Sequence, residues 1–149
     1  MTQNHLPQRK RLSHAIPDWV NTDAVFFVTI CARPRGIDQL CKDHFADGLL
    51  NSVRHREELR HWWVHLAVVM PDHVHLLVSF APEPGMERVI TAWKRLTTRN
   101  LGIAWQDGFF DSRLRTARSI EGKGAYVQEN PVRAGLVANA SDWPYTWTH

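Results

Sequence analysis

The sequence predicts an α+β fold: an antiparallel sheet built in the order strand, helix, strand, strand, helix, strand, followed by a C-terminal helix. Two segments with the periodicity of amphipathic helices separate four short runs rich in β-branched and aromatic residues. The middle two runs are joined by Pro71 and Asp72, which suit the central positions of a tight turn. This order is typical of the split ferredoxin-like arrangement, in which helices cover one face of the sheet.

The first strand and the first helix are predicted over 24–31 and 43–60. Residues 24–31 (AVFFVTIC) are apolar almost throughout, which indicates a strand buried on both faces. Within 43–60, Phe45, Leu49 and Val53 recur at four-residue spacing with charged residues between them, as on one face of a helix.

The second and third strands, over 63–70 and 73–80, are expected to pair as a hairpin. A second helix with two contrasting faces is predicted to follow them. Its apolar face consists of Met86, Val89, Ile90, Trp93 and Leu96, and a basic stripe opposite it consists of Arg88, Arg95 and Arg99.

The fourth strand is predicted over 109–115 and the last helix over 118–130. Gly122 and Gly124 weaken this helix, because glycine loses much conformational freedom on entering one. Pro131 is expected to end it, since proline has no N–H to donate.

A chain of 149 residues fits one domain, which is predicted over 21–149 behind a flexible N-terminal tail over 1–20. No apolar stretch approaches the roughly 20 residues of a membrane span, and the basic N-terminus has no apolar segment behind it. A cytoplasmic protein without a membrane partner is therefore expected. Cys31 and Cys41 form neither a CxxC pattern nor a disulfide framework, so both are expected to be reduced.

The charge pattern of the chain is compatible with a nucleic-acid partner. The net charge is only +3, but 14 of the 18 basic residues are Arg, whose planar guanidinium pairs with phosphate through two hydrogen bonds. A genome that favours Arg codons would give the same bias, so composition alone leaves both explanations open.

His73 and His75 lie two residues apart in a predicted strand, so their rings point to the same face of the sheet. Two imidazole nitrogens on a rigid strand, together with an added oxygen ligand, would suit Mg²⁺, Mn²⁺ or a similar ion. With nine His in the chain, chance gives such a triplet about half the time. Two histidines satisfied by ordinary hydrogen bonds are therefore the alternative. His61 and His65 are a rival pair, but they span a helix-to-strand junction and are not expected to share a face.

Tyr126 and Tyr145 are the two tyrosines of the chain. Tyr126 precedes Asn130 by four residues in the last predicted helix, which would place both side chains on one face. A phenol can act as a covalent nucleophile beside a cation, and a carboxamide oxygen can be a metal ligand. A half-buried packing tyrosine is the alternative for Tyr126, and Tyr145 is interpreted as a packing residue.

Four runs, taken in order, resemble the REP-associated tyrosine transposases within the HUH single-tyrosine transposase superfamily. These runs are VVMPDHVHLLV, WKRLTTRN, WQDGFFDSRLR and YVQENPVRAGLV, and the resemblance spans residues 24–137. Four motifs in a fixed order are far more specific than any one of them. One departure is Asp72, where such proteins commonly carry Asn, and this residue is not expected to touch a ligand.

The resemblance implies a transposase that nicks and rejoins single-stranded DNA beside a palindromic hairpin through a 5′-phosphotyrosine intermediate. It assigns the divalent metal to His73, His75 and Asn130 and the nucleophile to Tyr126, and it leaves Asp111 without a chemical role. Single-stranded or hairpin DNA is the implied partner. Candidates for phosphate contacts, each of which could instead be a solvated surface charge, are Arg88, Lys94, Arg95, Arg99, Arg113, Arg115, Arg118 and Arg133.

Two other functions compete with this interpretation. A small metal-dependent hydrolase is disfavoured because His-x-His sites of that kind are usually built on barrels of about 250 residues. A hairpin-binding protein that has lost catalysis is disfavoured only because His73, His75, Tyr126 and Asn130 are all retained. The hairpin recognised, the metal used in the cell and the choice between monomer and homodimer stay open.

Overall fold

The computed structural model describes residues 16–20, 24–42 and 44–149. Most of the tail predicted over residues 1–20 therefore lies outside the described residues. In its described part, Val20 is buried and Trp19 packs edge-on against Trp63, with 6.4 Å between ring centroids. No helix of the described residues is long and apolar enough to cross a membrane.

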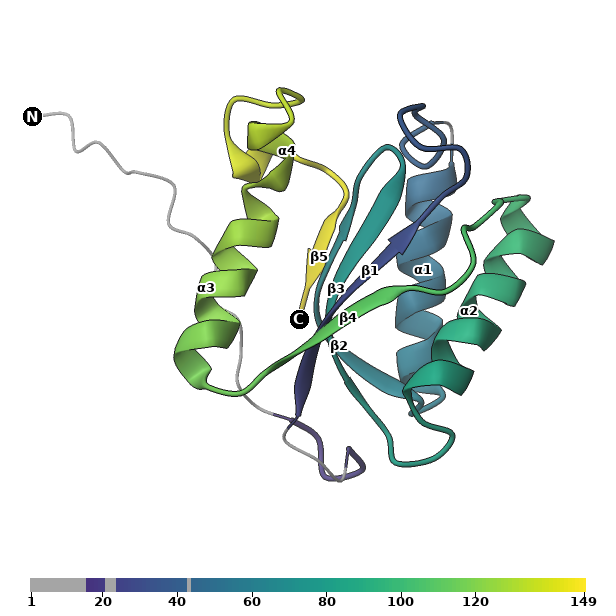
Figure 1. The fold of residues 1–149 in the computed structure, drawn as a ribbon, viewed down its shortest axis with the longest axis vertical. Coiled ribbons are helices and arrows are strands. Elements are labelled where there is room, and N and C mark those ends of the chain that lie inside the picture. Colours follow the sequence, from purple (N-terminus) through teal and green to yellow (C-terminus); the bar gives the residue numbers. More distant parts are fainter. Residues whose placement is uncertain (1–15, 21–23, 43) are drawn as a thin grey trace, which may run out of the picture.

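Five antiparallel strands form one sheet in the order β4-β1-β3-β2-β5 (Figure 1). The first four strands have the predicted ferredoxin-like order, so the predicted fold class is confirmed. The central strands β1 and β3 are apolar along most of their length because both of their faces are covered. The strands are β1 (Val25–Cys31), β2 (Trp62–Val69), β3 (His73–Phe80), β4 (Phe110–Leu114) and β5 (Thr146–Thr148).

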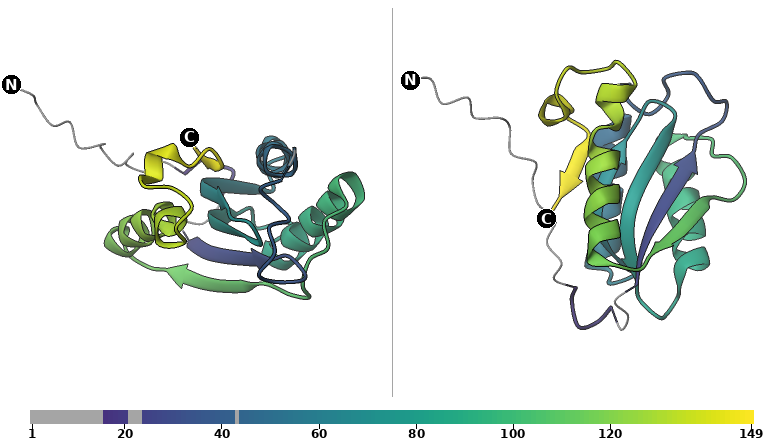
Figure 2. Two further views of the ribbon diagram at one scale, coloured as in Figure 1. Left: turned by 90° about the horizontal axis from the view of Figure 1, so that it is seen from above. Right: turned by 60° about the vertical axis from the view of Figure 1, so that its left-hand side comes forward.

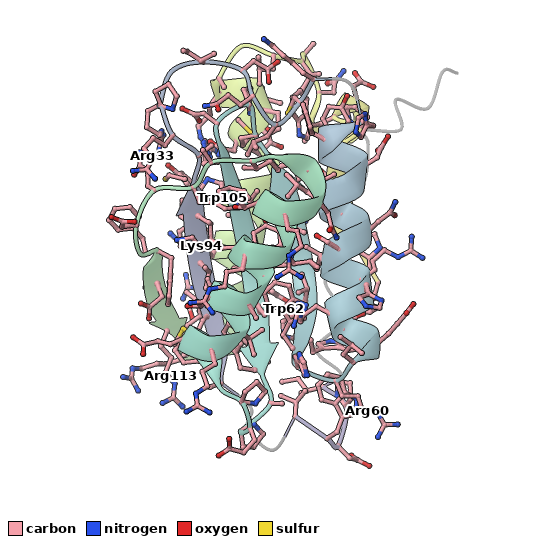
Figure 3. The ribbon with its side chains drawn as sticks, turned by 90° about the vertical axis from the view of Figure 1, so that its right-hand side faces the viewer. Arg33, Arg60, Trp62, Lys94, Trp105 and Arg113 are labelled. Carbon is pink, nitrogen blue, oxygen red and sulfur yellow. The ribbon has the colours of Figure 1, made fainter. Side chains whose placement is uncertain are left out.

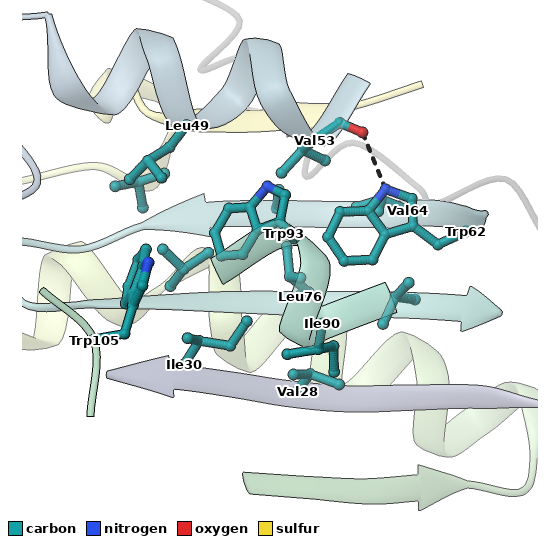
Figure 4. Close-up of a cluster of buried hydrophobic side chains, with 14 of the residues drawn as sticks. Val28, Ile30, Leu49, Val53, Trp62, Val64, Leu76, Ile90, Trp93 and Trp105 are labelled. Atoms are coloured by element: carbon teal, nitrogen blue, oxygen red, sulfur yellow. Dashed lines mark hydrogen bonds between the residues drawn. The ribbon is translucent and has the colours of Figure 1, made fainter. Parts of the chain in front are cut away.

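Helices α1 (Phe45–Glu58) and α2 (Met86–Leu101) cover one face of the sheet, as predicted. The largest side chains between them are Trp62 and Trp93, both fully buried and 6.0 Å apart between ring centroids (Figure 4). Each indole N–H has a partner: Trp62 donates to the carbonyl of Val53 at 3.0 Å, and Trp93 to the hydroxyl of Ser52 at 2.8 Å. This core fixes the sheet on which the site is built.

Helix α3 (Ala117–Gln128) lies on the opposite face of the sheet (Figure 2). Alternation along the strands creates the two faces: Leu76 packs in the core beneath α1 and α2, whereas Leu77 packs with Val127 of α3. The helix begins with a capping box, in which Thr116 and Ser119 satisfy each other's backbone N–H groups. The tyrosine-bearing helix is thus separated by the sheet from α1 and α2.

The end of the last helix differs from the prediction. Helix α3 stops at Gln128, and a separate short helix, α4 (Asn130–Arg133), contains Pro131 in its first turn. Proline cannot donate to a carbonyl one turn earlier, so the α3 hydrogen-bond ladder ends before it, while the first turn of a new helix tolerates it. Tyr126 and Asn130 therefore belong to two consecutive helices rather than to one helix face.

The C-terminal strand β5 was not predicted. It pairs with β2, with Leu66 opposite Thr148 and Val68 opposite Thr146. Just before it, the carbonyl of Tyr145 accepts the N–H of Val69 at 2.9 Å, and its ring packs at the edge of the core. The packing role expected for Tyr145 agrees with this position.

Candidate metal and tyrosine site

The rings of His73 and His75 share the face of the sheet on which α3 lies. Val74 between them points into the core beneath α1 and α2, as strand alternation requires. The two Nε2 atoms converge to 3.1 Å. Two nitrogens, each about 2.1 Å from one ion and at right angles to each other, would be about 3.0 Å apart. The spacing of the pair therefore fits two ligands of a single divalent ion.

The other nitrogen of each ring is held by a neighbouring oxygen. His73 Nδ1 lies 2.7 Å from Asp72 Oδ1, and a carboxylate can only accept, so this nitrogen carries the proton. His75 Nδ1 lies 2.9 Å from Thr29 Oγ1, a hydroxyl that can accept or donate. Each ring is thus held by an outer partner, as in many metal sites, and the two Nε2 atoms face each other at hydrogen-bond distance.

Asp72 contacts the candidate metal ligand His73, so the expectation that it would not touch a ligand was wrong. Asp72 is also held in place by two hydrogen bonds. Its Oδ2 accepts from Arg35 Nε at 2.9 Å and from the Gly36 amide at 2.8 Å. Burial raises the pKa of Asp72, but hydrogen bonds from Gly36, His73 and Arg35 outweigh it and lower the pKa to about 2. Asp72 therefore stays ionised at neutral pH. The tight turn it occupies is what brings its carboxylate back onto His73.

Both histidines are neutral near pH 7, the form that binds metal. Burial lowers the pKa of His73, and burial together with nearby cations lowers the pKa of His75 to about 3. Lys123 and Arg133 are among the cations that act on His75. Lys123 lies in the middle of α3, and Arg133 is the last residue of α4.

Tyr126 is 57% exposed, and two cations lie over its ring. The Arg133 guanidinium is 3.7 Å from the ring centroid and Lys123 Nζ is 5.2 Å from it. Lys123 Nζ also lies 4.8 Å from the ring of Phe27, which is itself 5.2 Å from the ring of His75. A continuous set of contacts therefore connects the tyrosine to the histidines across the sheet face.

Asn130 lies next to this set through Arg133. One Arg133 nitrogen, Nη2, donates to the carbonyl of Tyr126 at 2.7 Å and approaches Asn130 Oδ1 at 3.4 Å. Tyr126 in α3 and Asn130 in α4 were predicted to lie side by side. In the structure they are linked through the side chain of Arg133, which contacts both. Within residues 16–20, 24–42 and 44–149, no three His, Cys, Asp or Glu side chains gather into a possible metal site.

Comparison with known proteins decides the family. The sequence model described as "Transposase IS200 like" matches residues 28–130, more than half of the chain. The chain belongs to the IS200-like transposase family. The match includes His73, His75, Lys123, Tyr126 and Asn130 but neither Phe27 nor Arg133. The resemblance to REP-associated tyrosine transposases is confirmed.

Two known proteins are similar to this chain. The REP-associated tyrosine transposase of Escherichia coli (strain K12) is 30% identical over 87 residues, a match that covers 55% of this chain and 52% of that protein. The chain thus spans about half the length of the curated relatives it matches. A solved structure of a REP-associated tyrosine transposase bound to a REP hairpin has a TM-score of 0.72 at 21% identity, covering 98% of this chain and 82% of that one. This likeness confirms the fold.

The predicted basic residues of the chain fall on two sides of the sheet. Arg133 lies at Tyr126, whereas the α2 stripe lies on the other face. There, Arg88 and Arg95 line one hollow, and Arg95 and Arg99 line a second of about 530 Å³. Arg113 is exposed on the edge strand β4, and Arg115 and Arg118 are exposed around the turn into α3.

The second hollow also contains Arg33, which the sequence did not single out. Arg33, Lys94 and Trp105 lie together in Figure 3, with Trp105 almost fully buried. Lys94 donates to the carbonyls of Gln106 and Gly108 at 2.7 and 2.8 Å, so its ammonium ties the loop after α2 to the helix. The other charged side chains that line this hollow are the guanidinium groups of Arg33, Arg95 and Arg99 and the carboxylate of Asp107.

The rival histidines do not form a pair. His61 contacts Arg56 and His65 contacts Ser79, each through a side-chain hydrogen bond. Sequence reasoning missed Thr29, Arg35 and Lys123 beside the site. Only Lys123 carried a usable signal, since it precedes Tyr126 by one helical turn. The other two reach the site through strand pairing and a loop, which no local pattern reveals.

Proposed function

We propose that this IS200-like transposase nicks and rejoins single-stranded DNA beside a hairpin, with Tyr126 as the nucleophile. The observation that carries the proposal is the exposed Tyr126 with the cations Lys123 and Arg133 over its ring. Lys123 and Phe27 connect this tyrosine to the histidine pair, whose Nε2 atoms are 3.1 Å apart. We include a DNA hairpin in the proposed substrate because a REP-associated tyrosine transposase with this fold was solved bound to a REP hairpin.

In the proposed reaction the Tyr126 oxygen attacks a backbone phosphorus. A bond forms between that oxygen and phosphorus, the bond from phosphorus to the 3′ oxygen breaks, and the phenol proton leaves while the 3′ oxygen gains one. The upstream fragment then ends in a 3′-OH, and the 5′ phosphate of the downstream fragment is held on Tyr126. Attack by a 3′-OH on this phosphotyrosine reverses the exchange and joins strands without a nucleotide cofactor.

His73 and His75 would hold a divalent metal through Nε2, with Asn130 Oδ1 as the third protein ligand. The amide oxygen has two lone pairs, so Asn130 can keep Arg133 as a partner while it binds an ion. A divalent ion such as Mg²⁺ or Mn²⁺, when bound, supplies positive charge at the scissile phosphate. Asp72 and Thr29 keep the rings in the orientation that this binding needs.

Lys123 and Arg133 would hold the phosphate against the phenol and stabilise the negative charge that develops there. The guanidinium groups along α2, on the other face, would bind further backbone phosphates of the same DNA. A DNA strand that contacts both faces of the β-sheet has to pass around its edge. Single-stranded DNA does this more readily than a stiff duplex.

The test is a denaturing gel of the protein incubated with an end-labelled DNA hairpin carrying unpaired tails, with Mg²⁺ or Mn²⁺ present. The DNA should be taken from palindromes that flank the gene. We expect a slowly migrating protein–DNA band and a shortened strand, both absent in EDTA and in His73→Ala or His75→Ala. Asn130→Ala should give an intermediate yield, since water can replace one ligand.

His65→Gln serves as a matched control, because this histidine pairs with Ser79 away from the candidate ligands. It should keep cleavage activity. A hairpin-binding protein that has lost catalysis would bind the same DNA but give no band under any metal condition. A histidine variant that binds DNA and still cleaves it would exclude the metal assignment.

A further inference from the structure

Phe110 is an exposed aromatic ring beside the candidate site. It is 69% exposed, more than Tyr126 at 57%. Its neighbour Phe109 is half-buried and packs against the core beneath α1 and α2. Within β4, Phe110 and Leu114 are four residues apart and share one face, and Leu114 packs in the cluster beneath α3. Phe110 therefore lies on the α3 face of the sheet, which is the face of His75.

Strand pairing aligns Phe110 with the histidine. Phe110 of β4 is opposite Thr29 of β1, and Thr29 is opposite His75 of β3. Thr29 and His75 are joined by a side-chain hydrogen bond, so their side chains share one face. Neighbouring strands lie about 4.8 Å apart, so the backbones of Phe110 and His75 are separated by about 10 Å. A nucleotide next to a phosphate held at His75 would come within reach of the Phe110 ring.

Another phenylalanine near the site shows what is unusual about Phe110. The ring of Phe27, on the same face of β1, is covered by Lys123 and stacks near His75. Helix α3 begins near the other end of β4, where Leu114 is partly buried against the α3 core cluster. The Phe110 end of the edge strand is left open to solvent on this face, with Tyr126 and Lys123 on the facing helix.

We infer that Phe110 is a stacking platform for an unpaired base of the DNA strand next to the cleaved phosphate. The inference rests on the proposed function and adds a base-binding position to it. An aromatic face accepts any of the four bases, so the position selects unpaired nucleotides rather than a sequence. A base within a duplex is already stacked on both sides and cannot use the ring.

The experiment scans 2-aminopurine, whose fluorescence falls on stacking, through both unpaired tails of a DNA hairpin. The protein carries Tyr126→Phe, so the scan needs no cleavage and is informative even if the proposed chemistry fails. We expect fluorescence of the bound DNA to be quenched at one position or two adjacent positions. The quenching should be lost in Phe110→Leu, which keeps an apolar side chain, and kept in Phe110→Trp.

Phe110→Ala should raise the Kd for the tailed hairpin by about 5-fold to about 150-fold without lowering the melting temperature. Leu59→Ala, at an exposed apolar residue after α1 on the other face, should change neither value. An unchanged quenching pattern in Phe110→Leu and Phe110→Ala would overturn the inference. So would loss of a dimer in Phe110→Ala on size-exclusion chromatography, because the ring would then cover a second copy of the chain.

Discussion

At the scale of single residues, the carboxylate of Asp72 determines which nitrogen of His73 faces the site. It accepts the Nδ1 proton at 2.7 Å and is held in place by Arg35 and the Gly36 amide. A histidine oriented in this way needs no rearrangement before it binds an ion, and outer partners of this kind are worth roughly 10-fold to 100-fold in metal affinity.

Asp72→Ala should therefore weaken Mn²⁺ binding by about 10-fold to 100-fold. Asp72→Asn should weaken it less, because an amide oxygen can still accept the Nδ1 proton of His73. Isothermal titration calorimetry on protein without DNA measures this directly. Asp107→Asn, at the hollow on the other face of the sheet, is the matched control. Equal Mn²⁺ affinity in Asp72→Ala and the wild type would contradict the positioning role.

The resemblance carried by four motifs in order assigned His73, His75, Tyr126 and Asn130, whereas their local patterns alone left packing roles open. The sequence could not reveal Thr29 or Arg35, which reach the histidines from β1 and the loop after it. Nor could it show that Arg133 contacts the tyrosine ring, since that contact depends on how α4 turns after Gln128. The metal and the roles of the four residues stay predictions.

At the scale of elements, four strands and the two core helices follow from local patterns alone. Their apolar runs and periodicities are strong, and the core beneath α1 and α2 satisfies them. Strand β5 was missed because its three residues have no alternation of their own and are held by pairing with β2. The division between α3 and α4 was missed because Pro131 is compatible with a helix end and with a helix start.

Helix α3 is the least stable of the long helices by composition, and Gly122 offers a way to test its contribution. This glycine is helical, and no atom lies within 4 Å of the position an added Cβ would take. Gly122→Ala should raise the free energy of unfolding by about 0.5–1 kcal/mol, because alanine loses less conformational freedom in a helix.

Gly102→Ala is the informative counterpart, because Gly102 caps α2 with a φ of 72°. A side chain there is strained, and we expect the free energy of unfolding to fall by about 1–2 kcal/mol. Urea denaturation followed by circular dichroism measures both variants. A loss of stability in Gly122→Ala would show that the helix depends on a contact at that glycine.

At the scale of the whole molecule, the sheet separates the tyrosine site from the basic face of α2. Tyr126, Lys123 and Arg133 lie on one side, and Arg88, Arg95 and Arg99 on the other. DNA bound on both sides would neutralise several phosphates and release their counterions. The DNA therefore has to bend where it passes the edge of the β-sheet.

Binding should therefore favour single-stranded or hairpin DNA with unpaired tails over a blunt duplex of the same sequence. The affinity should also fall linearly with salt on a double-logarithmic plot, with a slope of about 0.7 to 0.9 per neutralised phosphate. Fluorescence anisotropy over a series of NaCl concentrations gives both results. Equal affinity for the blunt duplex would contradict a path around the sheet.

The central claim is that Tyr126 becomes covalently joined to DNA, and mapping the adduct by mass spectrometry tests it most directly. Trypsin cleaves after Lys123 and Arg133, so Tyr126 falls in the peptide 124–133 and Tyr145 in the peptide 134–149. After incubation with the tailed hairpin and Mn²⁺, followed by nuclease digestion, we predict a nucleotide mass on peptide 124–133. Tyr126→Phe should give no adduct, whereas Tyr145→Phe should give the same adduct as the wild type. A nucleotide on peptide 134–149, or full cleavage by Tyr126→Phe, would contradict the account.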